Sequence, residues 1–312
     1  MKQVLLKSGV WLNRRSVRFV LMLAVLAFIF AKIDRSSLLA HLSRFDPAAG
    51  IAIVAIFLLS IAVFALRWWY ISRALGVEAP FKDFIRVLWI SQSVSECGPP
   101  LVVGELARFQ LMRGSAETWQ LVVGQVLDRL SGKAVLLLMV VGLTPVYLRL
   151  YREFPGFQIA LFALILLASV SVAALVFRRF WPMARLHTGV VLAVCNPLRS
   201  PRHYGLSLLI QILLAMNFAL AAIGLGISAD SLTVFVLGPL LLLGVSSLPG
   251  LVSDWGKREA AAVFLLAPAG LTPEQSLAVS LVFGALHLLT ALPGALLLLL
   301  VRRRATVSAP SG

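Results

Sequence analysis

The pattern of hydrophobic positions along the chain predicts a bundle of membrane-spanning helices. Six long stretches are almost wholly apolar and are separated by more polar segments. In a bilayer every backbone polar group must find a partner within the protein, so such stretches form helices, and each needs about 20 residues to cross. The predicted spans are 17–33, 48–66, 134–150, 157–177, 204–225 and 276–301.

Local signals predict where some of these helices begin. Asp46 and Pro47 form a helix cap with proline at the first helical position, ahead of the second span. The segment 272–275 is a capping box with proline at its second position, ahead of the last span. The first span follows a basic N-terminus, as a signal peptide does, but it lacks a small-residue cleavage site. We therefore predict an uncleaved first helix.

Two further apolar regions, 84–113 and 232–269, do not read as simple spans. Each is interrupted near its middle by proline and glycine, which end or weaken a helix, and each then carries charges. Broken helices at membrane depth are tolerated where protein or a water-filled cavity surrounds them. We predict two re-entrant helix hairpins, whose breaks involve Gly98, Pro99, Pro100, Gly104, Pro249, Gly250 and Gly256.

The distribution of basic residues predicts the orientation. If both termini and the segment 178–203 are cytoplasmic, sixteen basic residues lie inside and five outside, in agreement with the positive-inside rule. This arrangement requires the first broken region to enter and leave from the inside and the second from the outside. The two halves of the chain would then be oppositely oriented, which is typical of transporters.

The predicted fold class is therefore an all-α polytopic membrane protein. It has about six full transmembrane helices plus two re-entrant helix hairpins in an inverted repeat. A single integral membrane domain covers 1–312, with a first half-repeat at 48–150, a second at 204–301 and a cytoplasmic linker at 178–203.

Composition excludes several other classes of protein. The 312 residues are 60% hydrophobic and 13% charged, whereas a soluble domain is nearer 25% charged. Long apolar runs also differ from the alternating strands of a β-barrel. The net charge of +15 is explained by topology and does not predict a nucleic-acid partner. Neither a metal-ligand spacing nor a catalytic motif occurs, so we predict no enzyme activity, no metal and no cofactor.

Three short blocks carry the candidate chemistry. In the first, Glu105 and Arg108 are three residues apart and share a helix face. They face a polar cavity or form an interfacial salt bridge. In the second, Asp254 can cap a helix whose N-terminus would attract an anion, or the block lies in water. In the third, Asp128 pairs with a neighbour or a hairpin charge, or marks a wet helix end. The candidate headgroup-binding residues are Glu105, Arg108, Asp128, Arg129, Lys257, Arg258 and Glu259.

Other polar residues predict less. Arg67, with the aromatic residues that follow it, is typical of an anchor at the membrane interface. His287 is interpreted as a packing residue in the last span, and Glu96 either pairs with a basic residue or is protonated. Gln211 and Asn217 are predicted to form hydrogen bonds between helices or to line a cavity.

The three blocks together resemble a known family of flippase-like integral membrane proteins, which is built on the transmembrane region of lysylphosphatidylglycerol synthase. The block from Pro99 to Arg108 is similar to the family's proline followed by G-E-x-x-R. The block 128–132 is similar to D/E-R-x-x-G, and the block 248–259 to L-P followed by G-x-G-x-R-E. Asp254 stands where the family usually has glycine. The resemblance implies translocation of lipid without the aminoacyl-transferring domain of the synthase.

The sequence thus predicts a lipid flippase of the cytoplasmic membrane that binds an anionic headgroup of a phospholipid or a polyprenyl-linked lipid. Arginine and lysine would bind phosphate, and Glu105 or Glu259 would pair with an arginine of the other hairpin. One alternative is a membrane scaffold for a lipid-modifying enzyme, with that enzyme or a second copy of the chain as partner. Another is an intramembrane transferase with Glu105, Asp128 or Glu259 as acid or base.

Overall fold

The fold is entirely helical in the part of the chain that the structure describes. The computed structural model describes residues 34–97, 103–154, 200–247 and 255–307, with six isolated positions between 155 and 199. Its α-helices are α2 (Arg35–Ser43), α3 (Pro47–Ala74), α4 (Phe81–Cys97), α5 (Val103–Met112), α6 (Thr118–Leu150), α10 (Pro201–Gly224), α11 (Ser231–Ser247), α12 (Lys257–Leu265) and α13 (Pro273–Val307), with a 3-10 turn at Ala267–Ala269.

Among the described residues, four helices are long and apolar enough to cross a membrane: α3, α6, α10 and α13. They confirm four of the six predicted spans, and the chain is a multi-pass membrane protein. The span at 17–33 lies outside the described residues, as does 157–177 apart from three isolated positions. Large apolar side chains face outward on these helices, such as Ile51, Leu138 and Leu296, each more than 60% exposed. Lipid tails would cover such a surface.

Two of these helices are longer than their apolar cores. α3 continues eight residues past the predicted end at 66 and stops where Gly76 adopts a positive φ of 87°. α6 begins at Thr118 instead of 134, because the Glu117 backbone N–H donates to the Gln120 side chain in a capping box. Polar residues that seemed to lie beyond the spans therefore belong to the helices.

The predicted helix starts are confirmed. The Asp46 carboxylate accepts from the Ala48 backbone N–H at 2.9 Å, and Pro47 opens α3. At the start of α13, the Gln275 N–H donates to the Thr272 hydroxyl at 3.3 Å, and the Thr272 N–H donates to the Gln275 side chain at 3.0 Å. These bonds satisfy N–H groups that have no partner within the helix.

Each of the two broken regions forms a pair of short helices. α4 and α5 pack against each other, as do α11 and α12. At 1.5 Å per residue, the ten residues of α5 and the nine of α12 span only about 15 Å, half of the hydrocarbon thickness. α5 runs antiparallel to α4, as shown by Gly104 at the start of α5, which packs against Ser95 and Ser91 near the end of α4. The break residues Gly98, Pro99, Pro100, Pro249 and Gly250 lie outside the described residues.

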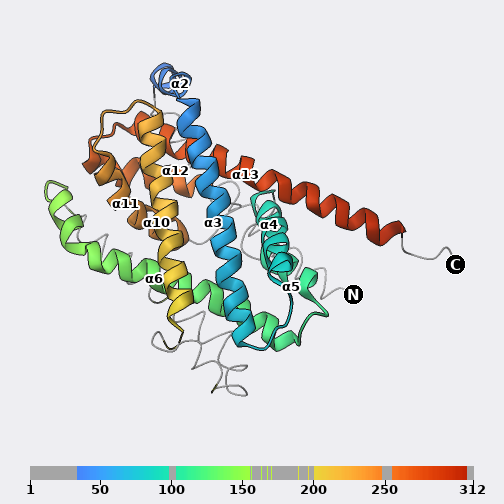
Figure 1. Cartoon of the computed structure of the whole chain (residues 1–312). Coiled ribbons are helices and arrows are strands. Elements are labelled where there is room, and N and C mark those ends of the chain that lie inside the picture. The colour runs from blue at the N-terminus through green and yellow to red at the C-terminus, as the bar shows by residue number, and fades with distance from the viewer. Residues whose placement is uncertain are drawn as a thin grey trace, which may run out of the picture.

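The same succession of helices occurs twice along the chain. α4 covers 81–97 and α11 covers 231–247, an offset of 150 residues. From 53 to 68, each position is as buried as its counterpart 150 residues later. The two leading helices are antiparallel, since the Asp46 N–H at the start of α3 donates to the carbonyl of Gly224 at the end of α10, at 2.7 Å. Figure 1 shows α3 and α10 side by side, running in opposite directions.

Each hairpin packs on the last helix of the other half. α4 lies against α13, where Trp89 Nε1 donates to the Thr290 carbonyl at 2.7 Å. In the corresponding place α11 lies against α6, and the Tyr147 hydroxyl donates to the Val236 carbonyl at 3.0 Å. The two halves are therefore interlocked through their hairpins, around the central pair of α3 and α10.

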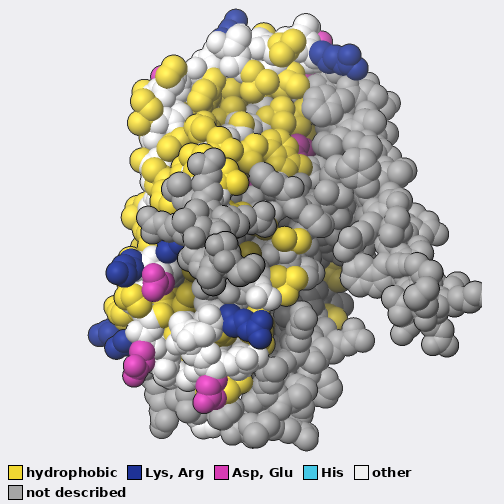
Figure 2. Space-filling model, turned by 90° about the vertical axis from the view of Figure 1, so that its right-hand side faces the viewer, with side chains coloured by type: hydrophobic (Ala, Val, Ile, Leu, Met, Phe, Trp, Pro, Cys, Tyr) yellow, Lys and Arg dark blue, Asp and Glu magenta, His cyan; other side chains and the backbone are white. Residues whose placement is uncertain are grey.

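The surface has an apolar zone between charged ends. Figure 2 shows one face of the molecule on which hydrophobic side chains gather between charged groups at the lower end and a smaller number at the upper end. This distribution is the one expected for a protein that crosses a bilayer. The charged side chains of the candidate functional site, by contrast, lie inside the protein.

Candidate functional site

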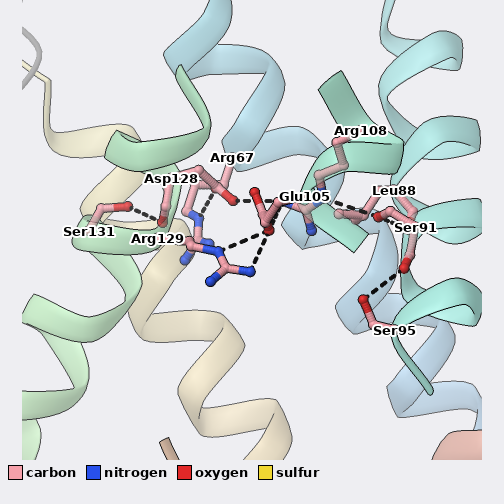
Figure 3. A network of polar contacts seen from close by, with 9 residues as sticks. All are labelled: Arg67, Leu88, Ser91, Ser95, Glu105, Arg108, Asp128, Arg129 and Ser131. Carbon is pink, nitrogen blue, oxygen red and sulfur yellow. Dashed lines mark hydrogen bonds and ion pairs between the residues drawn. The ribbon is translucent and has the colours of Figure 1, made fainter. Parts of the chain in front are cut away.

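An ion pair between α3 and α6 forms the centre of a buried polar network. Arg67 Nε donates to Asp128 Oδ1 at 2.7 Å, and each side chain is only 3% exposed. Arg67 Nη1 also donates to the Ser207 hydroxyl of α10 at 3.1 Å. One guanidinium group thus joins three membrane helices, two from the first half and one from the second. Figure 3 shows its contact with Asp128.

Gly132 provides the space that this guanidinium occupies. A β-carbon at this position would lie 2.9 Å from Arg67 Nη1. Gly132 follows Asp128 by four residues, so the two lie on one face of α6. The Asp128 carboxylate and the space left beside Gly132 therefore meet the same arginine. The Gly132 carbonyl also accepts from Gln211 Nε2 at 3.3 Å, which confirms the predicted interhelical role of Gln211.

The interpretation of Arg67 as an interfacial anchor is wrong. Its side chain is buried about two turns before α3 ends, so Arg67 does not belong with the basic residues of the loops. The sequence holds one signal for this position. The helix stop lies at Gly76, nine residues further on, which places Arg67 within the helix.

The first hairpin adds the predicted charged pair to this network. Arg108 Nη1 lies 3.8 Å from Glu105 Oε1 and 3.5 Å from Asp128 Oδ2. Its Nε donates to the Ser91 hydroxyl at 3.1 Å, and its guanidinium lies 5.2 Å from the ring centre of Trp68. The predicted pairing of Glu105 with Arg108, and of Asp128 with a hairpin charge, is confirmed. Asp128 is therefore not at a wet helix end.

Arg129 completes the network from the other side. Its Nη2 and Nε donate to Glu105 Oε1 at 2.6 and 2.9 Å. The Gln125 amide, oriented to satisfy both neighbours, donates to the second Glu105 oxygen at 3.2 Å. The Arg129 side chain is 35% exposed, the most open of the group. Lys133 follows four residues later on the same face of α6 and is half-buried.

This first network is positively charged. It contains three arginines and two carboxylates, and Lys133 adds a further cation on the same helix face. A net charge of about +2 inside a membrane protein is unfavourable unless an anion or water solvates it. The arrangement suits binding of an anionic group, because its arginines present several N–H donors to one region.

A second network lies at the start of α12. Arg258 Nη2 donates to Glu259 Oε1 at 2.8 Å, with side-chain exposures of 6% and 0%. Glu259 also accepts from the Ser280 hydroxyl at 3.2 Å and from the Gly256 backbone N–H. The Arg258 guanidinium lies 4.7 Å from the ring centre of Trp255. The alternative that this block lies in water is therefore wrong for Arg258 and Glu259.

The neighbouring residues fix this second network in place. Lys257 Nζ donates to the Val245 carbonyl at 3.3 Å and thereby ties α12 to α11. Gly256 precedes α12 with a φ of 85°, a conformation that favours glycine. A β-carbon on Gly284 of α13 would overlap the Arg258 guanidinium, so this glycine gives room to an arginine as Gly132 does. Asp254, the predicted cap, lies outside the described residues.

The predicted pairing between hairpins is wrong. Among the described residues, Glu105 pairs with Arg108 and Arg129, and Glu259 pairs with Arg258, all within their own halves. The physical reason is that α5 packs on α6, and α12 on α13, whereas α4 and α11 make the contacts between halves.

His287 belongs to a third polar group, which the sequence interpretation of this residue as a packing residue missed. Its Nδ1 lies 3.1 Å from Glu96 Oε1, and its Nε2 lies 2.8 Å from the Gln92 side-chain nitrogen. Glu96 thus pairs with a basic residue, which is one of the two alternatives predicted for it. The available signal was the spacing of Gln92 and Glu96, which puts both on one face of α4. Asn217, by contrast, is buried without a hydrogen-bond partner in the described structure, so its predicted bond is absent.

No curated protein and no solved structure matches the chain. A family model described as "Lysylphosphatidylglycerol synthase TM region" matches residues 15–294, a range that includes both networks, the helices α3, α6 and α10 and most of α13. The chain that buries these charges among its membrane helices therefore belongs to the family of the lysylphosphatidylglycerol synthase transmembrane region.

Proposed function

We propose that the chain is a lipid flippase that moves a phospholipid or a polyprenyl-linked lipid between the leaflets of the cytoplasmic membrane. The observation that carries the proposal is the positively charged network around Arg67, Asp128 and Arg108, buried between membrane-spanning helices. A lipid phosphate would supply the missing negative charge while its tails remain in the bilayer. The role is transport and not catalysis.

The arrangement of the two halves supports transport. Their leading helices, α3 and α10, are antiparallel, and each half continues with a hairpin and a long apolar helix. This is what an inverted repeat at 48–150 and 204–301 with two re-entrant hairpins requires. Broken helices from two inverted halves commonly form the binding sites of transporters near the midplane. The charge distribution of the loops favours cytoplasmic N- and C-termini.

Arg129 offers the sharpest test of the headgroup site. It is the most exposed member of its network, and Glu105 keeps Arg108 as a partner when Arg129 is removed. We expect Arg129→Gln to lower the rate of translocation of fluorescent phosphatidylglycerol in proteoliposomes by at least tenfold. A charge-assisted contact to phosphate is worth about 1.5–3 kcal/mol, which corresponds to roughly 10–150-fold.

The matched control is Arg113→Gln. Arg113 follows α5 and is exposed, and it belongs to neither network. The same substitution there should leave the rate within a factor of two of the unmodified chain. Equal rates for Arg129→Gln and the unmodified chain would remove the assigned role of Arg129. A purified, folded chain that translocates neither phosphatidylglycerol nor a polyprenyl phosphate would contradict the proposed function.

A second candidate function is a membrane scaffold or accessory subunit of a lipid- or glycan-modifying system. The local pairing of Glu105 and Glu259 within their own halves favours it, because satisfied charges need no ligand. Under this alternative the reconstituted chain moves no lipid, and it co-purifies with a lipid-modifying enzyme from the native membrane. The translocation assay therefore separates the two candidates.

A further inference from the structure

Glu96, Gln92 and His287 join the first hairpin to the last helix of the second half. Glu96 and Gln92 lie one turn apart on α4, and the imidazole of His287 on α13 fits between their polar ends at 3.1 and 2.8 Å. The side chains of Glu96 and His287 are only 17% and 23% exposed. An ionisable pair buried to this extent in a membrane protein is uncommon, and such pairs occur in ion and proton pathways.

The contact geometry indicates which atoms carry protons. His287 Nδ1 faces a carboxylate oxygen, which can only accept when Glu96 is ionised, so Nδ1 donates. Nε2 faces the Gln92 amide nitrogen, which can only donate, so Nε2 accepts. With Glu96 ionised and Gln92 donating to Nε2, His287 is neutral and the pair as a whole carries one negative charge. A proton added at Nε2 would leave two donors facing each other, and Gln92 would have to turn.

The surroundings of the pair are aromatic. The imidazole lies 4.9 Å from the ring of Phe57 and 6.2 Å from that of Phe283. Arg258 of α12 also contacts the Phe283 ring, at 5.5 Å, and Arg108 of α5 donates to Ser91 of α4. The other ionisable side chains on helices packed against α4 or α13 form no ion pair with Glu96 or His287 in the described structure. They are Arg35 and His41 of α2 and Arg44 directly after it, Arg67 and Arg73 of α3, Glu105 of α5, Arg202 and His203 of α10, and Lys257 and Glu259 of α12.

We infer that Glu96 and His287 form a proton-binding site and that lipid translocation is coupled to the movement of a proton through it. The coupling rests on the proposed function, whereas proton binding does not. One negative charge among aromatic rings is unfavourable, and a proton removes it. When the site opens to water, the carboxylate is solvated and the proton leaves. The affinity for the proton therefore differs between closed and open forms.

The site is also placed where its charge can change the fold. Pro293 has no N–H, and close by the carbonyls of Thr290 and Ala291 accept from Trp89 and Ser93 of α4. Two of the bonds between α4 and α13 thus lie near Glu96 and His287, beside the close packing of Gly294 on the α4 backbone. Rearranging Gln92 on protonation alters this contact and moves the first hairpin relative to the second half.

A pH gradient across proteoliposomes tests the coupling. If one proton accompanies each lipid, a difference of one pH unit should produce about a tenfold difference in labelled phosphatidylglycerol between the leaflets at steady state. Glu96→Gln and His287→Gln should each abolish this response, with a leaflet ratio near one, while lipid still equilibrates without a gradient. Glu78→Gln and His41→Gln are the matched controls, on exposed or peripheral positions, and should respond like the unmodified chain.

If the unmodified chain moves lipid but the ratio of labelled lipid between the leaflets does not change with the pH gradient, the coupling is overturned and the proposed function remains. The same holds if variants at Glu96 and His287 still follow the gradient. If the unmodified chain moves no lipid at all, the proposed function fails instead. Proton binding is measured separately, by infrared difference spectra of the full chain in lipid nanodiscs at changing pH. A carboxyl band should change with pH and vanish in Glu96→Gln, and its absence in the unmodified chain would overturn the site.

Discussion

Asp128→Asn should lower the free energy of unfolding by about 3–5 kcal/mol. The substitution removes the carboxylate that neutralises Arg67, and a buried ion pair that loses one partner leaves an uncompensated charge. Arg108 loses its contact with Asp128 at the same time. Equilibrium unfolding in mixed micelles with increasing dodecyl sulfate measures the change, and Glu153→Gln, on an exposed residue after α6, should change stability by less than about 0.5 kcal/mol.

A double substitution separates the charge effect from the loss of packing. Arg67→Met combined with Asp128→Leu removes both charges and keeps similar volumes, so it should recover most of the stability that Asp128→Asn loses. A double variant as unstable as the single one would mean that the hydrogen bond to Ser207 and the fit against Gly132 matter more than charge.

Gly294→Ala should separate the first hairpin from α13 and lower stability by about 1–3 kcal/mol or more. A β-carbon at this position would overlap the Trp89 carbonyl oxygen and lie 2.7 Å from its carbonyl carbon, so the backbone of α4 itself must move. The same unfolding titration measures the loss. Accessibility of a cysteine placed at Ser93 should rise in the variant if α4 moves.

Gly142→Ala is the matched control for this glycine. A β-carbon at Gly142 of α6 meets nothing within 4 Å. Alanine is favoured over glycine in a helix by about 1 kcal/mol, so this variant should be as stable as the unmodified chain or slightly more stable. Equal stability of Gly294→Ala and Gly142→Ala would contradict the close approach of α4 to α13.

Features that depend on neighbouring residues could be predicted from the sequence. The caps at Asp46 and Thr272 involve bonds within three residues, and the pairing of Glu105 with Arg108 follows from their spacing on one helix. Long apolar runs indicate membrane helices because the bilayer leaves the backbone few alternatives. The four described spans and the two pairs of short helices were therefore predictable, apart from their ends.

The partners of Arg67 and His287 could not be predicted in this way. Arg67 meets Asp128 and Ser207, which lie 61 and 140 residues away, and Glu96 is even more remote from His287 in the sequence. A hydropathy pattern treats a single charge as the end of a span. It carries no information on whether another helix brings a carboxylate to the same depth.

The two halves share a backbone framework but have different interiors. Asn217 stands 150 residues after Arg67, and Phe283, stacked on Phe218 at 4.1 Å, stands 155 residues after Asp128, as α13 begins 155 after α6. One framework therefore accepts either an ion pair or an aromatic contact. Because losing only one charge is strongly unfavourable, positions 67 and 128 should change together during the divergence of the family, either both charged or both uncharged.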